Sequence, residues 1–204
     1  MKKLLLTGFE PFGGEKINPA LEAVRSVKDE IGGLQVVKLQ VPVVFCEADR
    51  LIRSEMERLQ PDAVMCVGQA GGRDAITPER VAINVMDAVA ADNAGNVMTD
   101  CAVAADGPAA YFATLPVKDM IAAVQSQGIA CRISNTAGTY VCNNVMYGAL
   151  HYAAQHMPHT LAGFVHVPYI PEQTVGKENV PSMPLKQIVQ ALEAMIGVIA
   201  EKIV

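Results

Sequence analysis

The stretch Pro61-Asp62-Ala63-Val64-Met65-Cys66-Val67-Gly68-Gln69-Ala70-Gly71-Gly72 determines which class of fold the sequence predicts. Pro61 ends a helical pattern, and the apolar run at 63–67 is typical of a buried strand. The glycines that follow mark a loop at the carboxyl end of that strand. Open α/β sheets bind ligands at this edge, so we expect the functional site there.

Strand-like and helix-like segments alternate on both sides of this stretch, which predicts an α/β sandwich with a largely parallel sheet. We expect strands at residues 2–7, 35–41, 63–67, 80–86, 131–134 and 161–167. We expect helices at residues 20–28, 48–59, 108–127 with an interruption at Pro116, after 142, and 185–203. Residues 87–106 are polar and irregular, and the length of this segment suggests an excursion that covers a site.

The composition predicts one compact domain over residues 1–204. The chain is 51% hydrophobic and 18% charged, which is sufficient for a sizeable buried core. Its formal charge of −5 and its lack of basic clusters argue against nucleic acid or an anionic membrane as a partner. Glu10 and Pro11 end the first apolar run too early for a signal peptide, and no run is long enough to span a bilayer.

Cysteine usage argues against a disulfide framework and against a zinc site. The five cysteines, an odd number, are dispersed and never show CxxC spacing; they are Cys46, Cys66, Cys101, Cys131 and Cys142. We therefore expect reduced thiols in the cytoplasm, and no metal or cofactor.

Cys142 is the candidate nucleophile. It precedes a helical pattern, and unpaired N–H groups and the macrodipole at a helix amino end stabilise a thiolate. We therefore expect a lowered pKa and a nucleophile at neutral pH. Helix position alone leaves the alternative of a small buried apolar residue equally open. The other four cysteines are interpreted as packing or surface thiols.

His166 is the candidate base, because it lies near the carboxyl end of the apolar strand at 161–167, at the same sheet edge as Cys142. A histidine in such a strand is also commonly a satisfied core residue, and that alternative stays open. His151, His156 and His159 are interpreted as surface histidines of the preceding helix.

Glu79 is the best carboxylate to orient the imidazole of His166, as the third member does in Ser-His-Asp and Cys-His-Asn arrangements. It stands just beyond the glycine-rich loop and is followed by an apolar run. The alternative is a surface glutamate paired with Arg80, which the sequence alone does not exclude.

Two phenylalanines lie in the segment Thr7-Gly8-Phe9-Glu10-Pro11-Phe12-Gly13-Gly14. Glycine and proline interrupt regular structure, so we expect Phe9 and Phe12 to leave the first strand. Their rings either fold back onto the core or clamp a ligand.

Several long motifs follow one another along nearly the whole chain. They are LTGFEPFGG at 6–14, CVGQAGGR at 66–73, ITPERVAIN at 76–84, GPAAY at 107–111, TAGTYVCN at 136–143 and HVPYIPEQ at 166–173. In this order they resemble the type I pyroglutamyl peptidases, also called pyrrolidone-carboxylate peptidases. The resemblance implies a cysteine exopeptidase that removes an amino-terminal pyroglutamate from peptides through a thioester acyl-enzyme.

The resemblance also implies a three-layer α/β/α sandwich around a mostly parallel, twisted mixed sheet, commonly assembled as a homotetramer. The catalytic residues of the family align with Glu79, Cys142 and His166. No metal is needed.

Pyroglutamate would explain the aromatic pair, because its lactam ring is neutral, flat and compact. The resemblance implies that Phe9 and Phe12 enclose this ring, and we expect Gln69 and Val141 in the same pocket. Asn18 is expected to act as a helix cap rather than as a ligand contact.

One departure from the family lies at Val89, where members typically carry an arginine in Asp-Ala-Arg-Ile-Pro-Asp-Asn. The cationic side chain is absent here. The backbone N–H groups of Cys142 and Val89 are still expected to form the oxyanion hole, because main-chain donation does not depend on residue type.

Two rival functions remain at this stage. A nucleotide or nucleoside enzyme is suggested by the glycine-rich loop at 68–72, which matches neither GxGxxG nor GxxxxGK[ST]. A non-catalytic module that captures small apolar ligands with its phenylalanines is the other.

Overall fold

A computed structural model describes residues 1–203. Within these residues the main sheet has six strands in the order β2-β3-β1-β4-β8-β5, of which the central β3, β1, β4 and β8 are parallel and the outer two are antiparallel. Their bounds are β1 Lys2–Phe9, β2 Glu30–Ile31, β3 Leu34–Val41, β4 Ala63–Gln69, β5 Thr77–Pro78 and β8 Leu161–Val167. The expectation of a mostly parallel mixed sheet is confirmed.

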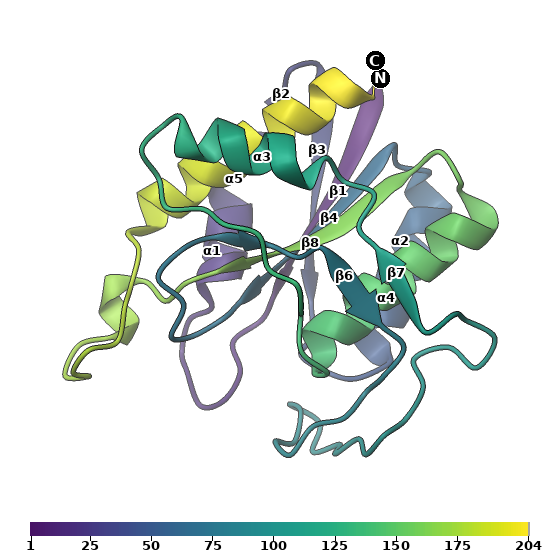
Figure 1. The fold of residues 1–204 in the computed structure, drawn as a ribbon, viewed down its shortest axis with the longest axis horizontal. Coiled ribbons are helices and arrows are strands. Elements are labelled where there is room, and N and C mark those ends of the chain that lie inside the picture. The colour runs from purple at the N-terminus through teal and green to yellow at the C-terminus, as the bar shows by residue number, and fades with distance from the viewer. Residues whose placement is uncertain (204) are drawn as a thin grey trace.

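Helices cover both faces of this sheet and give the three layers expected (Figure 1). On one face lie α1 (Pro19–Ser26), α3 (Val117–Gln125) and α5 (Leu185–Lys202). On the other face lie α2 (Glu47–Leu59) and α4 (Val141–His156). A short 3₁₀ helix, η1 (Pro171–Gln173), follows β8.

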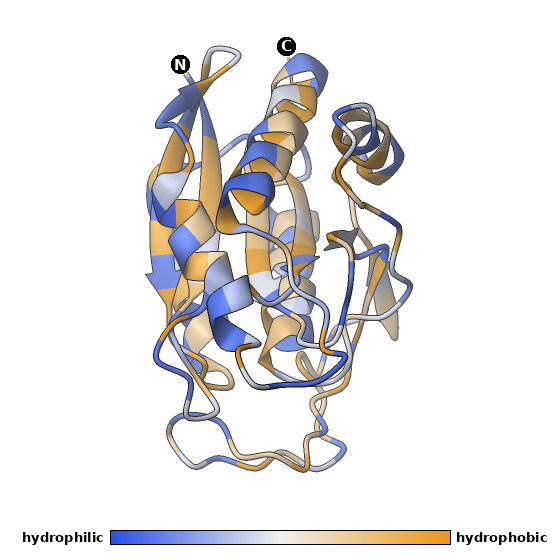
Figure 2. Ribbon diagram, turned by 90° about the vertical axis from the view of Figure 1, so that its left-hand side faces the viewer, coloured by the Kyte–Doolittle hydropathy of each residue, from blue (hydrophilic) through white to orange (hydrophobic). Residues whose placement is uncertain are grey.

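Each central strand supplies side chains to both layers of the core. In β1, Leu4 and Leu6 pack under α1 and α5, whereas Leu5 packs under α2 and α4, and all three are fully buried. Successive side chains of a strand point to opposite faces, so a strand covered on both sides must be apolar throughout. Figure 2 shows these apolar strands in the interior.

The site-bearing edge of the sheet is formed by the carboxyl ends of the parallel strands and the loops that follow them (Figure 1). Beside it, β6 (Val81–Ile83) and β7 (Ala110–Phe112) form a separate two-stranded sheet. The segment between them holds no helix or strand and is anchored next to this edge, for example by Asn93 N–H, which donates to Val43 O at 2.9 Å.

Four secondary-structure expectations need correction. The helix expected at 108–127 begins only after Pro116, because its first part pairs as β7. The strand expected at 80–86 is limited to β6, and that expected at 131–134 is reduced to isolated bridges such as Glu79 with Ser134. Phe9 does not leave β1 but is its last residue.

Among the residues that the structure describes, every helix is too short or too polar to cross a bilayer.

Candidate active site

Three different elements bring the candidate catalytic side chains to one edge of the sheet. Cys142 is the second residue of α4, His166 is the sixth residue of β8, and Glu79 directly follows β5. The short β5 pairs with β8 so that Thr77 faces His166 across the ladder, and Glu79 N–H donates to Phe164 O at 2.9 Å. This pairing fixes the carboxylate beside the imidazole.

Glu79 and His166 form a buried, hydrogen-bonded pair. His166 Nδ1 lies 2.7 Å from Glu79 Oε1, and the Glu79 side chain is fully inaccessible to solvent. The alternative of a surface glutamate paired with Arg80 is therefore wrong. Burial alone would raise the pKa of Glu79, but hydrogen bonds and charge from His166, aided by Arg73, outweigh it and lower the pKa.

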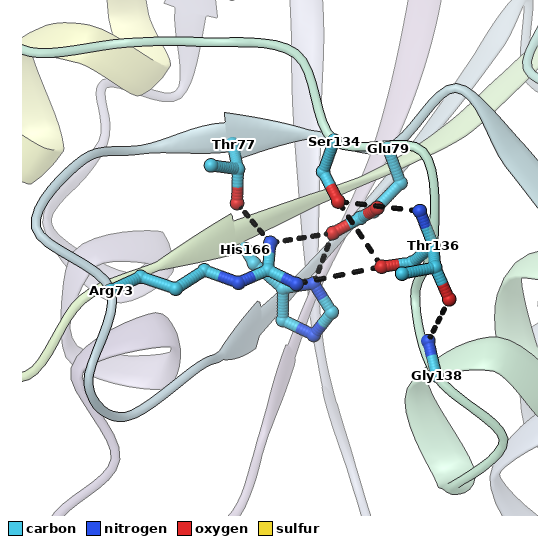
Figure 3. A network of polar contacts seen from close by, with 7 residues as sticks. All are labelled: Arg73, Thr77, Glu79, Ser134, Thr136, Gly138 and His166. Atoms are coloured by element: carbon cyan, nitrogen blue, oxygen red, sulfur yellow. Dashed lines mark hydrogen bonds and ion pairs between the residues drawn. The ribbon is translucent and has the colours of Figure 1, made fainter.

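The imidazole is held neutral by its surroundings. Burial lowers the pKa of His166 below its ordinary 6.5, and the neighbouring Glu79 carboxylate offsets this only in part. Because Glu79 engages Nδ1, Nε2 is the ring nitrogen left to accept a proton from a nucleophile (Figure 3).

Cys142 and His166 line the same cavity. The sulfur lies against Gly68, where a Cβ would stand only 3.1 Å from Sγ, and Gly68 is the direct neighbour of His166 in the parallel ladder. Within residues 1–203 no hydrogen bond joins Sγ to the imidazole. The thiol of Cys142 and the imidazole of His166 thus lie in the wall of one cavity.

The expected low pKa of Cys142 is wrong for the free protein. Burial raises the pKa of this thiol to about 12, and the Glu79 charge adds to the increase. Arg73 and the helix-terminal N–H of Cys142 act in the opposite direction but are outweighed. Both shifts favour the uncharged forms at neutral pH, a thiol at Cys142 and a neutral imidazole at His166.

The cavity beside the thiol has a volume of about 190 Å³ and is mainly apolar. It includes all four residues expected to bind substrate, together with the candidate nucleophile and the candidate base; the lining comprises Phe9, Phe12, Asn18, Val43, Gln69, Ala137, Tyr140, Val141, Cys142 and His166. Pockets for drug-sized ligands occupy about 300–1,000 Å³, so this one suits a single small ring.

The phenylalanines behave differently from one another. Phe9 is buried, and its ring lies 6.3 Å from the Phe164 ring, so it belongs both to the core and to the cavity wall. Phe12 lies in the loop after β1 and is half-buried at the cavity. Asn18 caps α1, its Oδ1 accepting from Ala20 N–H at 3.0 Å, and it also lines the cavity.

Three cavity residues were not anticipated from the sequence: Val43, Ala137 and Tyr140. Val43 follows the carboxyl end of β3, and this position at the binding edge is a signal that could have revealed it. The hydroxyl of Tyr140 donates to Ala91 O at 3.1 Å and so links the cavity to the irregular segment.

Val89 does not line the cavity, and its side chain is fully exposed. The oxyanion role of its backbone N–H stays a prediction.

His151 is not a surface residue as expected. Only 9% exposed, it places Nδ1 3.0 Å from the Tyr111 hydroxyl. In the described part of the chain, no three histidine, cysteine or acidic side chains are grouped so that they could hold a metal ion.

The arrangement of Cys142, His166 and Glu79 indicates the class of protein. A thiol beside an imidazole whose other nitrogen is held by a carboxylate is the chemistry of cysteine hydrolases, built here on an α/β sheet.

Comparisons with known proteins identify the family within this class. Residues 2–202 match the family model described as pyroglutamyl peptidase. The pyrrolidone-carboxylate peptidase of Clostridium perfringens is 50% identical over 97% of this chain and 92% of that protein. Pyrrolidone-carboxylate peptidase 1 of Streptococcus pneumoniae serotype 4 is 49% identical over 98% of this chain and 93% of that protein. The chain belongs to the pyroglutamyl peptidase family.

Solved structures agree with this assignment. The pyroglutamyl peptidase I of Bacillus amyloliquefaciens has a TM-score of 0.94 and 46% identity, covering 98% of this chain and 95% of that chain. A mutant of pyrrolidone carboxyl peptidase from the hyperthermophile Pyrococcus furiosus has a TM-score of 0.95 and 42% identity, covering 99% of this chain and 100% of that chain. Membership of this family argues against both rival functions, the nucleotide enzyme and the non-catalytic module.

Proposed function

We propose that this protein is a cysteine exopeptidase that hydrolyses the bond after an amino-terminal pyroglutamate, with Cys142, His166 and Glu79 as its catalytic residues. The observation that carries the proposal is the small apolar cavity whose wall contains both Cys142 and His166, with Glu79 on the far nitrogen of the imidazole. Family membership supports the reaction.

In the first half of the reaction, Sγ of Cys142 attacks the pyroglutamyl carbonyl carbon while its proton passes to His166 Nε2. The Glu79 carboxylate stabilises the imidazolium that forms. When the carbon–nitrogen bond breaks, the imidazolium gives its proton to the departing amine. A pyroglutamyl thioester remains on Cys142.

In the second half, a water molecule attacks the thioester and gives its proton to the now neutral His166. The carbon–sulfur bond breaks, sulfur recovers the proton from the imidazolium, and pyroglutamic acid leaves. The starting state, a neutral thiol and a neutral imidazole, is restored.

Backbone N–H groups of Cys142 and of Val89 are proposed as donors to the oxyanion. Cys142 lies in the first turn of α4, where backbone N–H groups have no partner within the helix. One such donor lowers an acyl-transfer barrier by about 3–4 kcal/mol.

Recognition of the lactam ring is assigned to the cavity residues. Phe9 and Phe12 provide apolar faces for a flat neutral ring, Val141 closes the wall, and Gln69 offers an amide at the rim. Proline lacks the lactam carbonyl, so buried partners of that carbonyl would be left unpaired; sites of this kind discriminate by about 10⁴–10⁵.

A homotetramer in the cytoplasm is proposed from the family resemblance. Free thiols at Cys46 and Cys101, both exposed, fit a reducing compartment. Exposed apolar side chains of the small sheet, Ile83 and Phe112, offer surface for subunit contact. Sedimentation analysis measures the assembly, and a monomer at micromolar concentration would contradict it.

The proposed reaction is tested with a pyroglutamyl amide that releases a fluorescent amine. We expect the wild type to hydrolyse it and Cys142→Ala to lose at least about 1,000-fold in kcat/KM, because the nucleophile is gone. Cys101→Ala, which removes an exposed thiol outside the cavity, is the matched control and should keep its activity. A prolyl amide should not be cleaved. Equal activity of the wild type and Cys142→Ala would refute the mechanism.

A further inference from the structure

Arg73, the last residue of the CVGQAGGR motif and one to which the sequence assigned no role, reaches from the glycine-rich loop to the Glu79–His166 pair (Figure 3). Its Nη1 donates to Glu79 Oε1 at 2.8 Å, the same oxygen that His166 Nδ1 approaches at 2.7 Å. Nη1 also donates to the hydroxyl of Thr77, and Nη2 donates to Thr136 O at 3.4 Å. One guanidinium therefore contacts β5, the catalytic carboxylate and the loop before α4.

The first consequence is electrostatic. A buried carboxylate is costly unless its charge is compensated, and Glu79 has two available sources of positive charge, His166 and Arg73. With Arg73 in place, the carboxylate is compensated while the imidazole stays neutral. Glu79 Oε2 has no hydrogen-bond partner within residues 1–203, because the nearby Ser134 hydroxyl donates to Thr136 O at 3.1 Å; the contacts converge on Oε1.

The groups that face His166 are few. Glu79 Oε1 contacts its Nδ1, Arg73 donates to the same Glu79 oxygen, and Cys142 and Tyr140 are the other titratable side chains that line the cavity with it. The remaining neighbours on β4 and β8, Gly68 and Phe164, carry no charge. Arg73 is therefore the positively charged side chain that compensates the Glu79 carboxylate beside His166.

The second consequence is mechanical. Thr136, whose carbonyl accepts from Arg73, also accepts the N–H of Gly138 on its hydroxyl at 3.0 Å. Gly138 has a φ of +76°, a backbone conformation that favours glycine, and it lies in the loop directly before α4. Arg73 thus holds both the Glu79 carboxylate and the loop that precedes Cys142.

We propose that Arg73 is a positioning residue that compensates the Glu79 charge so that His166 stays neutral at rest, and that it holds Glu79 and the loop before Cys142 in register. This inference rests on the proposed function. In support, burial first and then Arg73 lower the pKa of His166, and Arg73 opposes the burial that raises the pKa of Cys142.

The test compares the pH profiles of kcat/KM for wild type, Arg73→Gln and Arg73→Lys. Glutamine removes the charge, so the imidazole should protonate more readily; the acid limb should move up by about 1 pH unit or more, with a lower maximum. Lysine keeps the positive charge but lacks the several N–H donors of the guanidinium. The pH values of the two limbs should therefore not change, while kcat falls by about 10- to 100-fold. Arg132→Gln, which removes an exposed arginine paired with Asp74, is the control and should resemble the wild type.

Two outcomes would overturn the inference. One is an Arg73→Gln profile that superimposes on the wild-type profile after scaling, since a merely structural role lowers activity without moving the limbs. The other is Arg73→Lys with unchanged kcat. If Arg73→Gln does not fold, as judged by near-ultraviolet circular dichroism, Arg73→Lys still decides the positioning role.

A substrate-free measurement separates this inference from the proposed function. The pH dependence of alkylation at Cys142 by iodoacetamide, quantified by mass spectrometry, should also move to higher pH in Arg73→Gln. A shift in alkylation without any hydrolysis of the pyroglutamyl amide by the wild type would retain the role of Arg73 and reject the substrate. If the wild type hydrolyses the amide but Arg73→Gln shifts neither the kcat/KM profile nor the alkylation profile, the proposed function stands and the role of Arg73 is rejected.

Discussion

At the scale of single residues, the absence of a side chain at Gly68 is as consequential as the presence of one at Cys142. A Cβ there would lie 2.7 Å from the ring of Phe164 and 3.1 Å from Sγ of Cys142. The first distance is shorter than real Cβ contacts, so an added methyl group must displace its neighbours. The position of the Cys142 sulfur therefore depends on glycine at residue 68.

We expect Gly68→Ala to lower kcat about 10- to 100-fold with a smaller change in KM, because a sulfur displaced from its seat loses alignment with the scissile carbonyl. Steady-state kinetics on the pyroglutamyl amide check this. Gly163→Ala, in the adjacent strand β8, is the matched control, since its Cβ would crowd the Leu115 side chain at 2.9 Å without touching the sulfur. If both variants lost activity equally, general destabilisation would account for the effect.

The sequence predicted the side chains that we propose as catalytic, but not the residues that support them. Cys142, His166 and Glu79 each stand at a recognisable place, a helix start or a strand end, and converge in the structure. Arg73 gave no such signal, because its role depends on a loop folding back to a carboxylate six residues later. The pKa of Cys142 was misjudged because helix position is local, whereas burial depends on the whole fold.

At the scale of elements, close backbone contact fixes α1 against β1. A Cβ at Gly8 would lie 2.9 Å from the Cα of Leu21 and 3.2 Å from Ala20 O, which are main-chain atoms that cannot rotate away. The same helix start carries Asn18, which lines the cavity. The position of α1 therefore affects both stability and the site.

Gly8→Ala should lower the free energy of unfolding by about 1–3 kcal/mol, because the helix must move off the strand to admit a methyl group. Urea denaturation measures the loss. For comparison, Gly197→Ala in α5 meets no heavy atom within 4 Å and should stabilise the protein by about 0.5–1 kcal/mol. An unchanged free energy of unfolding in Gly8→Ala would contradict the close packing of α1 on β1.

Long elements were predictable and short ones were not. The last helix and the strand at 161–167 show clear apolar patterns and match the structure closely. The two-residue β5 and the bridges at Cys131 and Ser134 depend on pairing with distant segments, which no local pattern records. The helix expected at 108–127 failed in its first part because those residues pair with β6 instead.

At the scale of the whole molecule, three cysteine thiols, the buried Cys66 and Cys131 and the partly exposed Cys142, make stability depend on alkaline pH. Burial raises the pKa of Cys66, Cys131 and Cys142 to about 12 from an ordinary 9.0. Between these values the unfolded chain releases protons that the folded chain retains. The free energy of unfolding must therefore fall as pH rises above about 9.

Urea denaturation at pH 8 and pH 10 checks this expectation. The wild type should be less stable at pH 10, and Cys131→Ala should show a smaller difference between the two pH values because one of the three thiols is gone. Cys101→Ala, which removes an exposed thiol, should keep the wild-type difference. Identical differences in all three proteins would show that burial of these thiols does not control alkaline stability.

The position of β8 has a consequence for when the chain can begin to work. This strand lies between β4 and β5 in the sheet yet comes after residue 160 in the sequence, and it carries His166 (Figure 1). A ribosome extends the chain from its amino end, so a nascent polypeptide that lacks β8 lacks both the proposed proton acceptor, His166, and the strand that pairs with β5 beside Glu79. With His166 as the proposed base, the chain gains hydrolytic competence only after β8 has been synthesised, and shorter translation products are inert toward the peptides around them.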